Sequence, residues 1–194
     1  MALDILNLPI AEFDRLAPVA PRRAPLFCFA LLTASCVLAS FALACATPFA
    51  AFAVLAAALL PLPTALLVMA AVWIVNQAIG FGVLGYPLDA KTLFWGVAIG
   101  AAALISTAVA KLVLRSLAQS SSNAAALALA LVGAYASYEL VLFAFTPALG
   151  GAGSFTLAVV ARLGFLDLLW LVGLVAACEV FRLLNAIRRR QMAS

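Results

Sequence analysis

Histidine is absent from this chain of 194 residues. Its absence excludes haem ligation by histidine, HExxH metalloprotease chemistry, a Ser-His dyad and a histidine proton relay, because each of them needs an imidazole. A GxxxxGKS/T phosphate-binding loop is also missing, so any step driven by ATP has to come from partner subunits. No GxGD or DxxD arrangement of acidic residues occurs, and we therefore expect a protein that is not an enzyme.

Charged residues are scarce as well, at 9% of the chain against 68% hydrophobic residues. Soluble proteins carry about a quarter charged residues, whereas this chain combines its low charge with a mean hydropathy of +1.24. A spanning helix needs roughly 20 apolar residues, so there is room for about six spans and no separate soluble domain. The sequence therefore predicts an all-α polytopic membrane protein, a compact bundle of about six transmembrane helices in a lipid bilayer.

The four cysteines all lie inside apolar runs and form no CxxC pair. This placement argues against a disulfide framework and against a zinc site. We interpret them as small packing residues, and we expect neither a metal site nor a cofactor. They are Cys28, Cys36, Cys45 and Cys178.

The apolar runs divide the chain into a cytoplasmic amphipathic segment at residues 1–24, a transmembrane domain at residues 25–187 and a basic cytoplasmic tail at residues 188–194. The first segment mixes apolar and acidic residues and ends at prolines, which favours a short interfacial helix. The second apolar run is short for a span, so it is either tilted or placed where the bilayer thins. The predicted spans cover residues 25–46, 49–60, 64–86, 92–114, 124–146 and a stretch within 155–184.

Basic residues gather near the two ends of the chain and indicate its orientation. Arg and Lys concentrate on the cytoplasmic side of membrane proteins, so both termini are predicted to be cytoplasmic in a bacterial-type inner membrane. The loop carrying Lys111 and Arg115 then also lies inside, and only Lys91 departs from the rule. This pattern explains the net charge of +4 by topology, and no nucleic acid is expected as a partner. The arginines at the ends are Arg15, Arg22, Arg23, Arg182 and Arg188 to Arg190.

Polar side chains within the spans are costly and mark functional sites by default. In the predicted orientation nearly all of them lie in the outer half of the bundle, and the inner half is almost bare. On three spans, polar and aromatic residues recur at helical spacing, so each span presents them on one face. A pocket with aromatic walls and a few polar anchors suits a small molecule. The predicted ligand-binding residues are Trp73, Asn76, Gln77, Tyr86, Trp95, Tyr135, Tyr138, Glu139, Arg162 and Asp167.

Structural roles for the same residues stay open. Asn76 and Gln77 could bond a neighbouring helix, and Glu139 could form a structural ion pair with Arg162. Tyr86 and Trp95 also fit the aromatic belt that many membrane proteins place at the interface.

Glycines around Phe81 have two interpretations. They either let the outer end of the third span unwind, or they offer flat surfaces against which a helix packs. They are Gly80, Gly82 and Gly85. Near the inner end of the last span, Glu179 and Arg182 are three residues apart and predict a surface pair.

In size, topology and site placement, the whole chain resembles the S components of energy-coupling factor (ECF) vitamin transporters. The resemblance implies a membrane subunit that captures a vitamin-like or cofactor-like solute from the outer side. It also implies two kinds of partner, a transmembrane coupling protein and ATPase subunits. In that family a small-residue surface on the first helix commonly docks the coupling protein, and here Ala30 and Ala34 have AxxxA spacing.

Two other functions fit the sequence. A non-catalytic structural or assembly subunit would use the same small-residue surfaces and would need no pocket. A small secondary carrier would use Glu139 or Asp167 as its titrating group. The observation that separates a binding subunit from a structural one is whether the polar residues surround a cavity or are consumed in bonds to one another.

Overall fold

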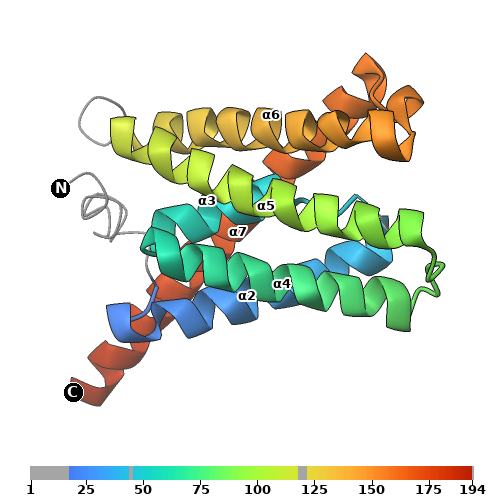
Figure 1. Cartoon of the computed structure of the whole chain (residues 1–194). Coiled ribbons are helices and arrows are strands. Elements are labelled where there is room, and N and C mark those ends of the chain that lie inside the picture. The colour runs from blue at the N-terminus through green and yellow to red at the C-terminus, as the bar shows by residue number, and fades with distance from the viewer. Residues whose placement is uncertain (1–17, 44–45, 118–121, 194) are drawn as a thin grey trace.

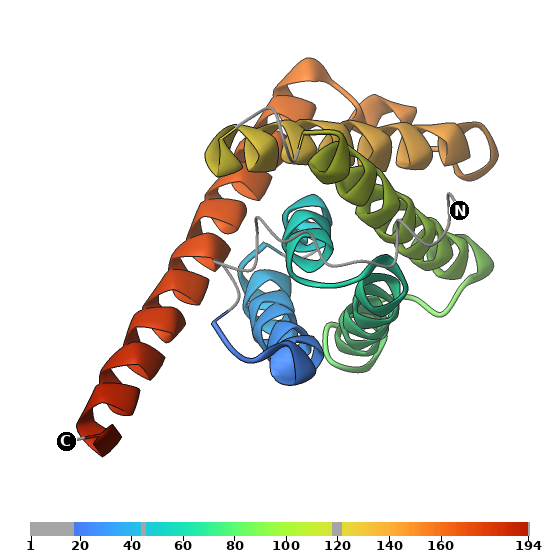
Figure 2. The same cartoon turned by 90° about the vertical axis from the view of Figure 1, so that its left-hand side faces the viewer.

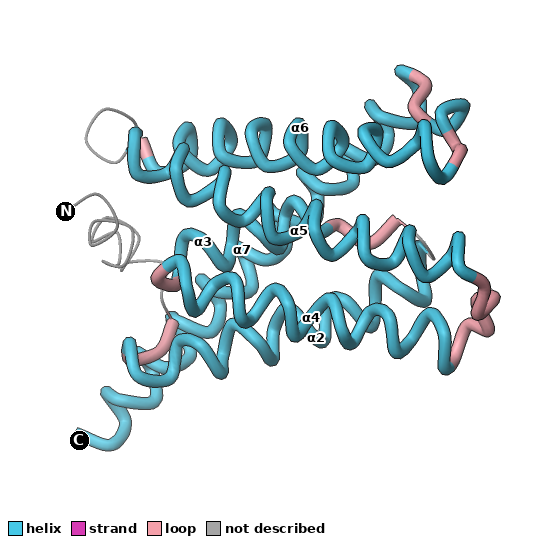
Figure 3. The backbone as a smooth tube through the Cα atoms, viewed as in Figure 1, coloured by secondary structure: helices cyan, strands magenta, loops and turns pink. Residues whose placement is uncertain are grey.

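The computed structural model describes residues 18–43, 46–117 and 122–193, which form a bundle of helices joined by short loops (Figures 1 and 3). The all-α fold is confirmed, and no strand occurs in these residues. The interfacial helix predicted for the first segment lies mostly outside them. The α-helices are α2 (Ala24–Leu43), α3 (Phe49–Leu59), α4 (Leu62–Gly82), α5 (Ala90–Leu117), α6 (Asn123–Leu149) and α7 (Leu157–Ala193), with 3-10 turns η2 (Pro21–Arg23) and η3 (Ala152–Ser154).

Prolines, glycines and one serine set many of the helix ends. Pro48 and Pro61 stand immediately before α3 and α4, where a missing backbone N–H costs nothing. Ser122 caps α6 by accepting a hydrogen bond from the Ala125 N–H at 3.3 Å. Gly150 follows the end of α6 with a φ of 77°, which a residue with a Cβ rarely adopts.

In the part of the chain that the structure describes, five helices are long and apolar enough to cross a membrane. They cover Pro21–Leu43, Leu62–Gly82, Ala90–Leu117, Asn123–Leu149 and Leu157–Arg188. Large apolar side chains such as Leu26, Leu67 and Leu140 are exposed on their outer surfaces, as lipid-facing residues are expected to be. The chain is therefore a multi-pass helical membrane protein.

Helix α3 differs from the other five because it is short and enclosed. It has 11 residues, of which all but Leu59 are buried. Its length is about 16 Å, roughly half of a bilayer core of about 30 Å. The chain returns through α3 between α2 and α4, which run in the same direction, and the other helices surround it (Figures 1 and 2).

Two charged side chains bind the backbone at the two ends of α3. The Ala51 N–H in the first turn donates to Asp167 Oδ1 at 2.8 Å. At the other end, Lys111 Nζ donates to the carbonyls of Ala57 and Leu60, both at 2.8 Å. Because Pro61 has no N–H, the carbonyl of Ala57 lacks its usual helical donor, and Lys111 supplies one. A negative group at the N-terminus and a positive group at the C-terminus also complement the helix dipole.

Lys111 corrects one expectation from the sequence. We placed it in an inner loop and described the inner half of the bundle as almost bare, but it lies within α5 and is 0% exposed. The signal was available, since an ionisable residue between Ala110 and Leu112 in a long apolar run marks a specific partner by default. Its partners, however, are backbone carbonyls far away in the sequence.

The two ends of the described chain meet on the same side of the bundle. Asn185 Nδ2 near the end of α7 donates to the carbonyl of Pro18 at 2.9 Å. This contact agrees with an even number of crossings of the bundle. The short helix α3 counts as one of them, because it carries the chain back from the end of α2 to the start of α4. The loop between α4 and α5 and the turn after α6 lie at the opposite end (Figure 1).

Candidate functional site

Two cavities lie side by side in the bundle and share Trp95 and Ile99 as a common wall. Cavity A has a volume of about 370 Å³, and cavity B of about 340 Å³. Cavity A is lined by Ala46, Thr47, Lys91, Trp95, Ile99, Tyr135, Tyr138, Glu139, Leu142, Leu149, Gly150, Gly151, Phe155, Val159, Leu163 and Asp167. Cavity B is lined by Ser40, Phe49, Asn76, Gln77, Gly80, Phe81, Leu84, Tyr86, Thr92, Trp95, Gly96 and Ile99.

Most of the predicted site residues line these cavities. Five of them line cavity A and four line cavity B, with Trp95 in both, so the structure brings eight together. Trp73 and Arg162 line neither cavity. The helical stripes predicted on α4 and α6 therefore face space inside the bundle rather than only another helix.

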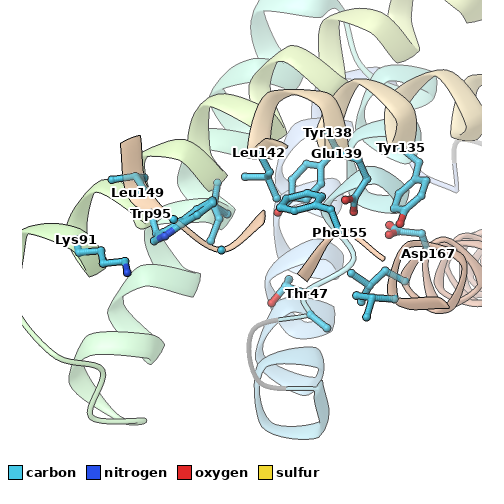
Figure 4. Close-up of a pocket in the computed structure, with 16 residues that line it drawn as sticks. Thr47, Lys91, Trp95, Tyr135, Tyr138, Glu139, Leu142, Leu149, Phe155 and Asp167 are labelled. Carbon is cyan, nitrogen blue, oxygen red and sulfur yellow. The ribbon is translucent and has the colours of Figure 1, made fainter. Parts of the chain in front are cut away.

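The acidic groups of cavity A lie together at one of its ends. Glu139 comes from α6 and Asp167 from α7, and Figure 4 shows both carboxyl groups close to the hydroxyl of Tyr135. Lys91 lies at the other end of the cavity beside Trp95, as Figure 4 shows. The cavity thus has two carboxyl groups at its inner end and an aromatic middle.

Asp167 already has a structural role at this end. Its side chain is 7% exposed, and its Oδ1 accepts the hydrogen bond from the Ala51 N–H. The carboxylate therefore joins α7 to the first turn of α3 while it also lines cavity A. A single residue contributes both to the fold and to the cavity wall.

Glu139 is half-buried and does not pair with Arg162. Arg162 is exposed on α7, outside both cavities. Within the described ranges the ion pair is between Glu179 and Arg182, at 2.6 Å, and it confirms the predicted surface pair. The alternative in which Glu139 is neutralised by Arg162 is therefore wrong for this structure.

Two tyrosines are held firmly in the wall of cavity A. The Tyr135 hydroxyl donates to the carbonyl of Val160 at 2.6 Å, and its ring packs beside Gly164, where an added Cβ would be 3.0 Å from Tyr135 Cε1. Tyr138 stacks on Phe49, the first residue of α3, with ring centroids 6.3 Å apart. These contacts fix two aromatic faces without filling the cavity.

A chain of amide hydrogen bonds forms the polar side of cavity B. Gln77 Nε2 donates to Asn76 Oδ1 at 3.2 Å, and Asn76 Nδ2 donates to Thr47 Oγ1 at 3.0 Å and to Ser40 Oγ at 3.2 Å. Asn76 thereby joins α4 to α2 and to the segment before α3. Asn76 therefore bonds a neighbouring helix, which is the structural role considered for these amides. Both amides also line cavity B.

Trp73 belongs to the predicted stripe but acts as a packing residue. Its Nε1 donates to the carbonyl of Gly96 at 2.9 Å. Its indole lies on Gly100, where an added Cβ would be only 2.6 Å from Trp73 Cε2. Gly96 and Gly100 of α5 therefore allow α4 to approach α5 closely.

The Gly100→Ala substitution is expected to destabilise the protein by about 1–3 kcal/mol, because the added methyl group overlaps the Trp73 indole. The shift of the indole should also break its hydrogen bond to Gly96 and change the tryptophan fluorescence. Gly82→Ala is the matched control, since nothing lies within 4 Å of an added Cβ there. Equal thermal midpoints for the two variants would show that the contact between Gly100 and the Trp73 indole leaves room for a methyl group.

Glycines near Phe81 serve packing and a turn rather than an unwound helix. α4 continues to Gly82, and Gly80 packs against the ring of Tyr86, 2.8 Å from the position of an added Cβ. Gly85 has a φ of 69° and reverses the chain so that Tyr86 can fold back. Gly80 is therefore a packing position, but its partner is the following loop and not another helix, as the packing interpretation predicted.

Asp89 lies outside the spans, and its carboxylate caps the start of α5. Its Oδ1 accepts from the Thr92 N–H at 2.8 Å, and its Oδ2 accepts from the Thr92 hydroxyl at 3.1 Å. The hydrogen bond from the Thr92 backbone lowers the pKa of Asp89. Its carboxylate lines neither cavity.

Sequence reasoning missed most of the apolar wall of cavity A. Leu142, Phe155 and Leu163 line it, but their side chains are of the same kind as those that face lipid. Thr47 had a usable signal, because a Thr-Pro pair between two apolar runs marks a break in the backbone inside the bundle.

No family model, curated protein or solved structure matches this chain. The class of the protein therefore follows from its fold and cavities alone. It is a multi-pass helical membrane protein with a half-length helix enclosed by five longer ones and two adjoining cavities near one end.

Proposed function

We propose that this protein is a membrane-embedded binding subunit that captures a small solute from the outer side of the membrane. Cavity A is the observation that carries the proposal. Its 370 Å³ lies in the range of about 300–1,000 Å³ typical of small-molecule sites. Its lining is mostly apolar and aromatic with a few polar groups, which is also typical of such sites.

The outward orientation rests on the distribution of basic residues. Lys91, Gly150 and Gly151 line cavity A and stand next to the loops at the end opposite Pro18 and Asn185. Arg22, Arg23 and Arg182 lie at the latter end, which the positive-inside rule assigns to the cytoplasm. Arg162, near the start of α7, departs from this pattern. In this orientation the solute enters from outside and both termini are cytoplasmic.

Partner subunits would supply the energy for uptake, as the resemblance to ECF S components implies. The sequence has no phosphate-binding loop of its own. Ala30 and Ala34 are both exposed on α2, so their AxxxA surface is free to pack closely against a transmembrane coupling protein. We propose a vitamin-like or cofactor-like solute and a binding role without catalysis.

Native mass spectrometry of the purified full-length protein tests this function. We expect a small molecule to be retained by the wild type and lost from Leu142→Trp, because the larger side chain fills cavity A. Leu140→Trp is the matched control on the same helix, since Leu140 is 68% exposed and lines neither cavity. A wild-type protein that carries a stoichiometric protein subunit and no small molecule would instead support an assembly role.

A further inference from the structure

We infer that the solute of cavity A is an organic cation, with an ammonium-type group on an apolar or aromatic body. The inference rests on the proposed function and specifies the chemistry of the solute. It starts from the charges at the inner end of the cavity, where Glu139 and Asp167 both contribute carboxylates.

Protein groups leave the negative charge at this end incompletely balanced. Asp167 receives the Ala51 N–H and lies at the positive end of the α3 dipole. Glu139 forms no ion pair in the described part of the chain, because the polar side chain beside it is the neutral Tyr135. Arg162, which the sequence offered as its partner, is exposed outside the cavity. A carboxylate inside a membrane bundle is costly without a cation, so a positively charged solute would be favoured there.

Aromatic walls provide a second reason for a cation. Trp95, Tyr138 and Phe155 line the cavity between its two ends (Figure 4). The faces of aromatic rings attract ammonium groups, and the attraction is stronger where water is excluded. The same rings accept an apolar body, so one solute can satisfy both the carboxylates and the walls.

Lys91 does not reverse this preference. It is exposed and lies beside Trp95, away from the carboxylates (Figure 4). Its charge is therefore screened by solvent and salt, whereas the carboxylates act within the bundle. Cavity B has no charged residue in its lining, so the preference for a cation belongs to cavity A alone.

Three probes with the same aromatic ring and different head charges test the inference: 2-phenylethylammonium, 2-phenylethanol and 3-phenylpropionate. Binding is measured by titration calorimetry on the full-length protein in lipid nanodiscs. We expect the ammonium to bind about tenfold more tightly than the neutral alcohol and the carboxylate to bind more weakly still. In Glu139→Gln, which keeps the size of the side chain, the preference of the ammonium over the alcohol should fall to about twofold or less.

Asp89→Asn is the matched control, because it removes the same charge from a residue that precedes α5 and lines neither cavity. It should keep the wild-type preference. Equal binding of the ammonium and the alcohol to the wild type, an unchanged preference in Glu139→Gln, or no binding of any probe overturns the cation inference. The proposed function is decided separately, since retention of any small molecule in the wild type and its loss from Leu142→Trp do not depend on charge.

Discussion

Lys111→Met is expected to lower the thermal midpoint of the purified protein by about 6–12 °C. Methionine is an unbranched side chain one atom shorter than lysine, and it removes the three N–H donors. The carbonyls of Ala57 and Leu60 then lose their partner at the end of a buried helix, and Pro61 cannot replace it. Two hydrogen bonds to a charged group are lost, and we expect a net cost of about 3 kcal/mol.

The control for this prediction is Lys91→Met. It makes the same chemical change at an exposed lysine near the other end of α5, and we expect its midpoint to match the wild type. Static light scattering or a fluorescent thiol probe that reacts with the buried cysteines can follow unfolding in detergent. A midpoint for Lys111→Met equal to that of Lys91→Met would contradict the stabilising role of Lys111.

Asp167→Ala is also expected to destabilise the protein, by about 1–2 kcal/mol, because the Ala51 N–H loses its acceptor at the first turn of α3. Asp167→Asn retains an oxygen acceptor in the same position and should cost much less, since asparagine caps helices about as well as aspartate. The two variants therefore separate the hydrogen bond from the charge. Thermal unfolding of both, beside the wild type, gives the comparison.

The order of the two Asp167 variants is the decisive result. If Asn and Ala destabilise equally, the charge of Asp167 matters more than its hydrogen bond to Ala51. If neither variant changes the midpoint, the cap contributes nothing to stability.

Much of the fold could be predicted from the pattern of apolar runs. The third predicted span, residues 64–86, corresponds to α4 (Leu62–Gly82), and the difference at its end has a local cause. The apolar run continues to Pro87, but Gly85 turns the chain back so that Tyr86 packs on Gly80. Composition alone does not distinguish the last turn of a helix from an apolar loop that folds over it.

The candidate site was predictable for its polar members and not for its walls. Glu139, Asp167 and Asn76 stand out because polar groups within spans need a reason to be there. Arg162 is also a polar residue within a predicted span, but it is exposed. The rotation of α7 against its neighbours decides which way this side chain points, and the sequence does not specify that rotation. Apolar wall residues such as Leu142 carry no signal at all, because lipid and a cavity select the same side chains.

By itself, the sequence determined the class of the protein, the number of apolar helices and the residues that need a polar partner. These properties follow from the cost of placing polar groups in a bilayer, which acts on each segment separately. The short length of the second apolar run was also visible in the sequence. Only the tertiary structure decided that this run, α3, is enclosed by the other helices, that Asp167 and Lys111 bind its two ends, and that Glu139 faces a cavity. These outcomes depend on contacts between residues far apart in the chain, and no local pattern specifies which helix faces which.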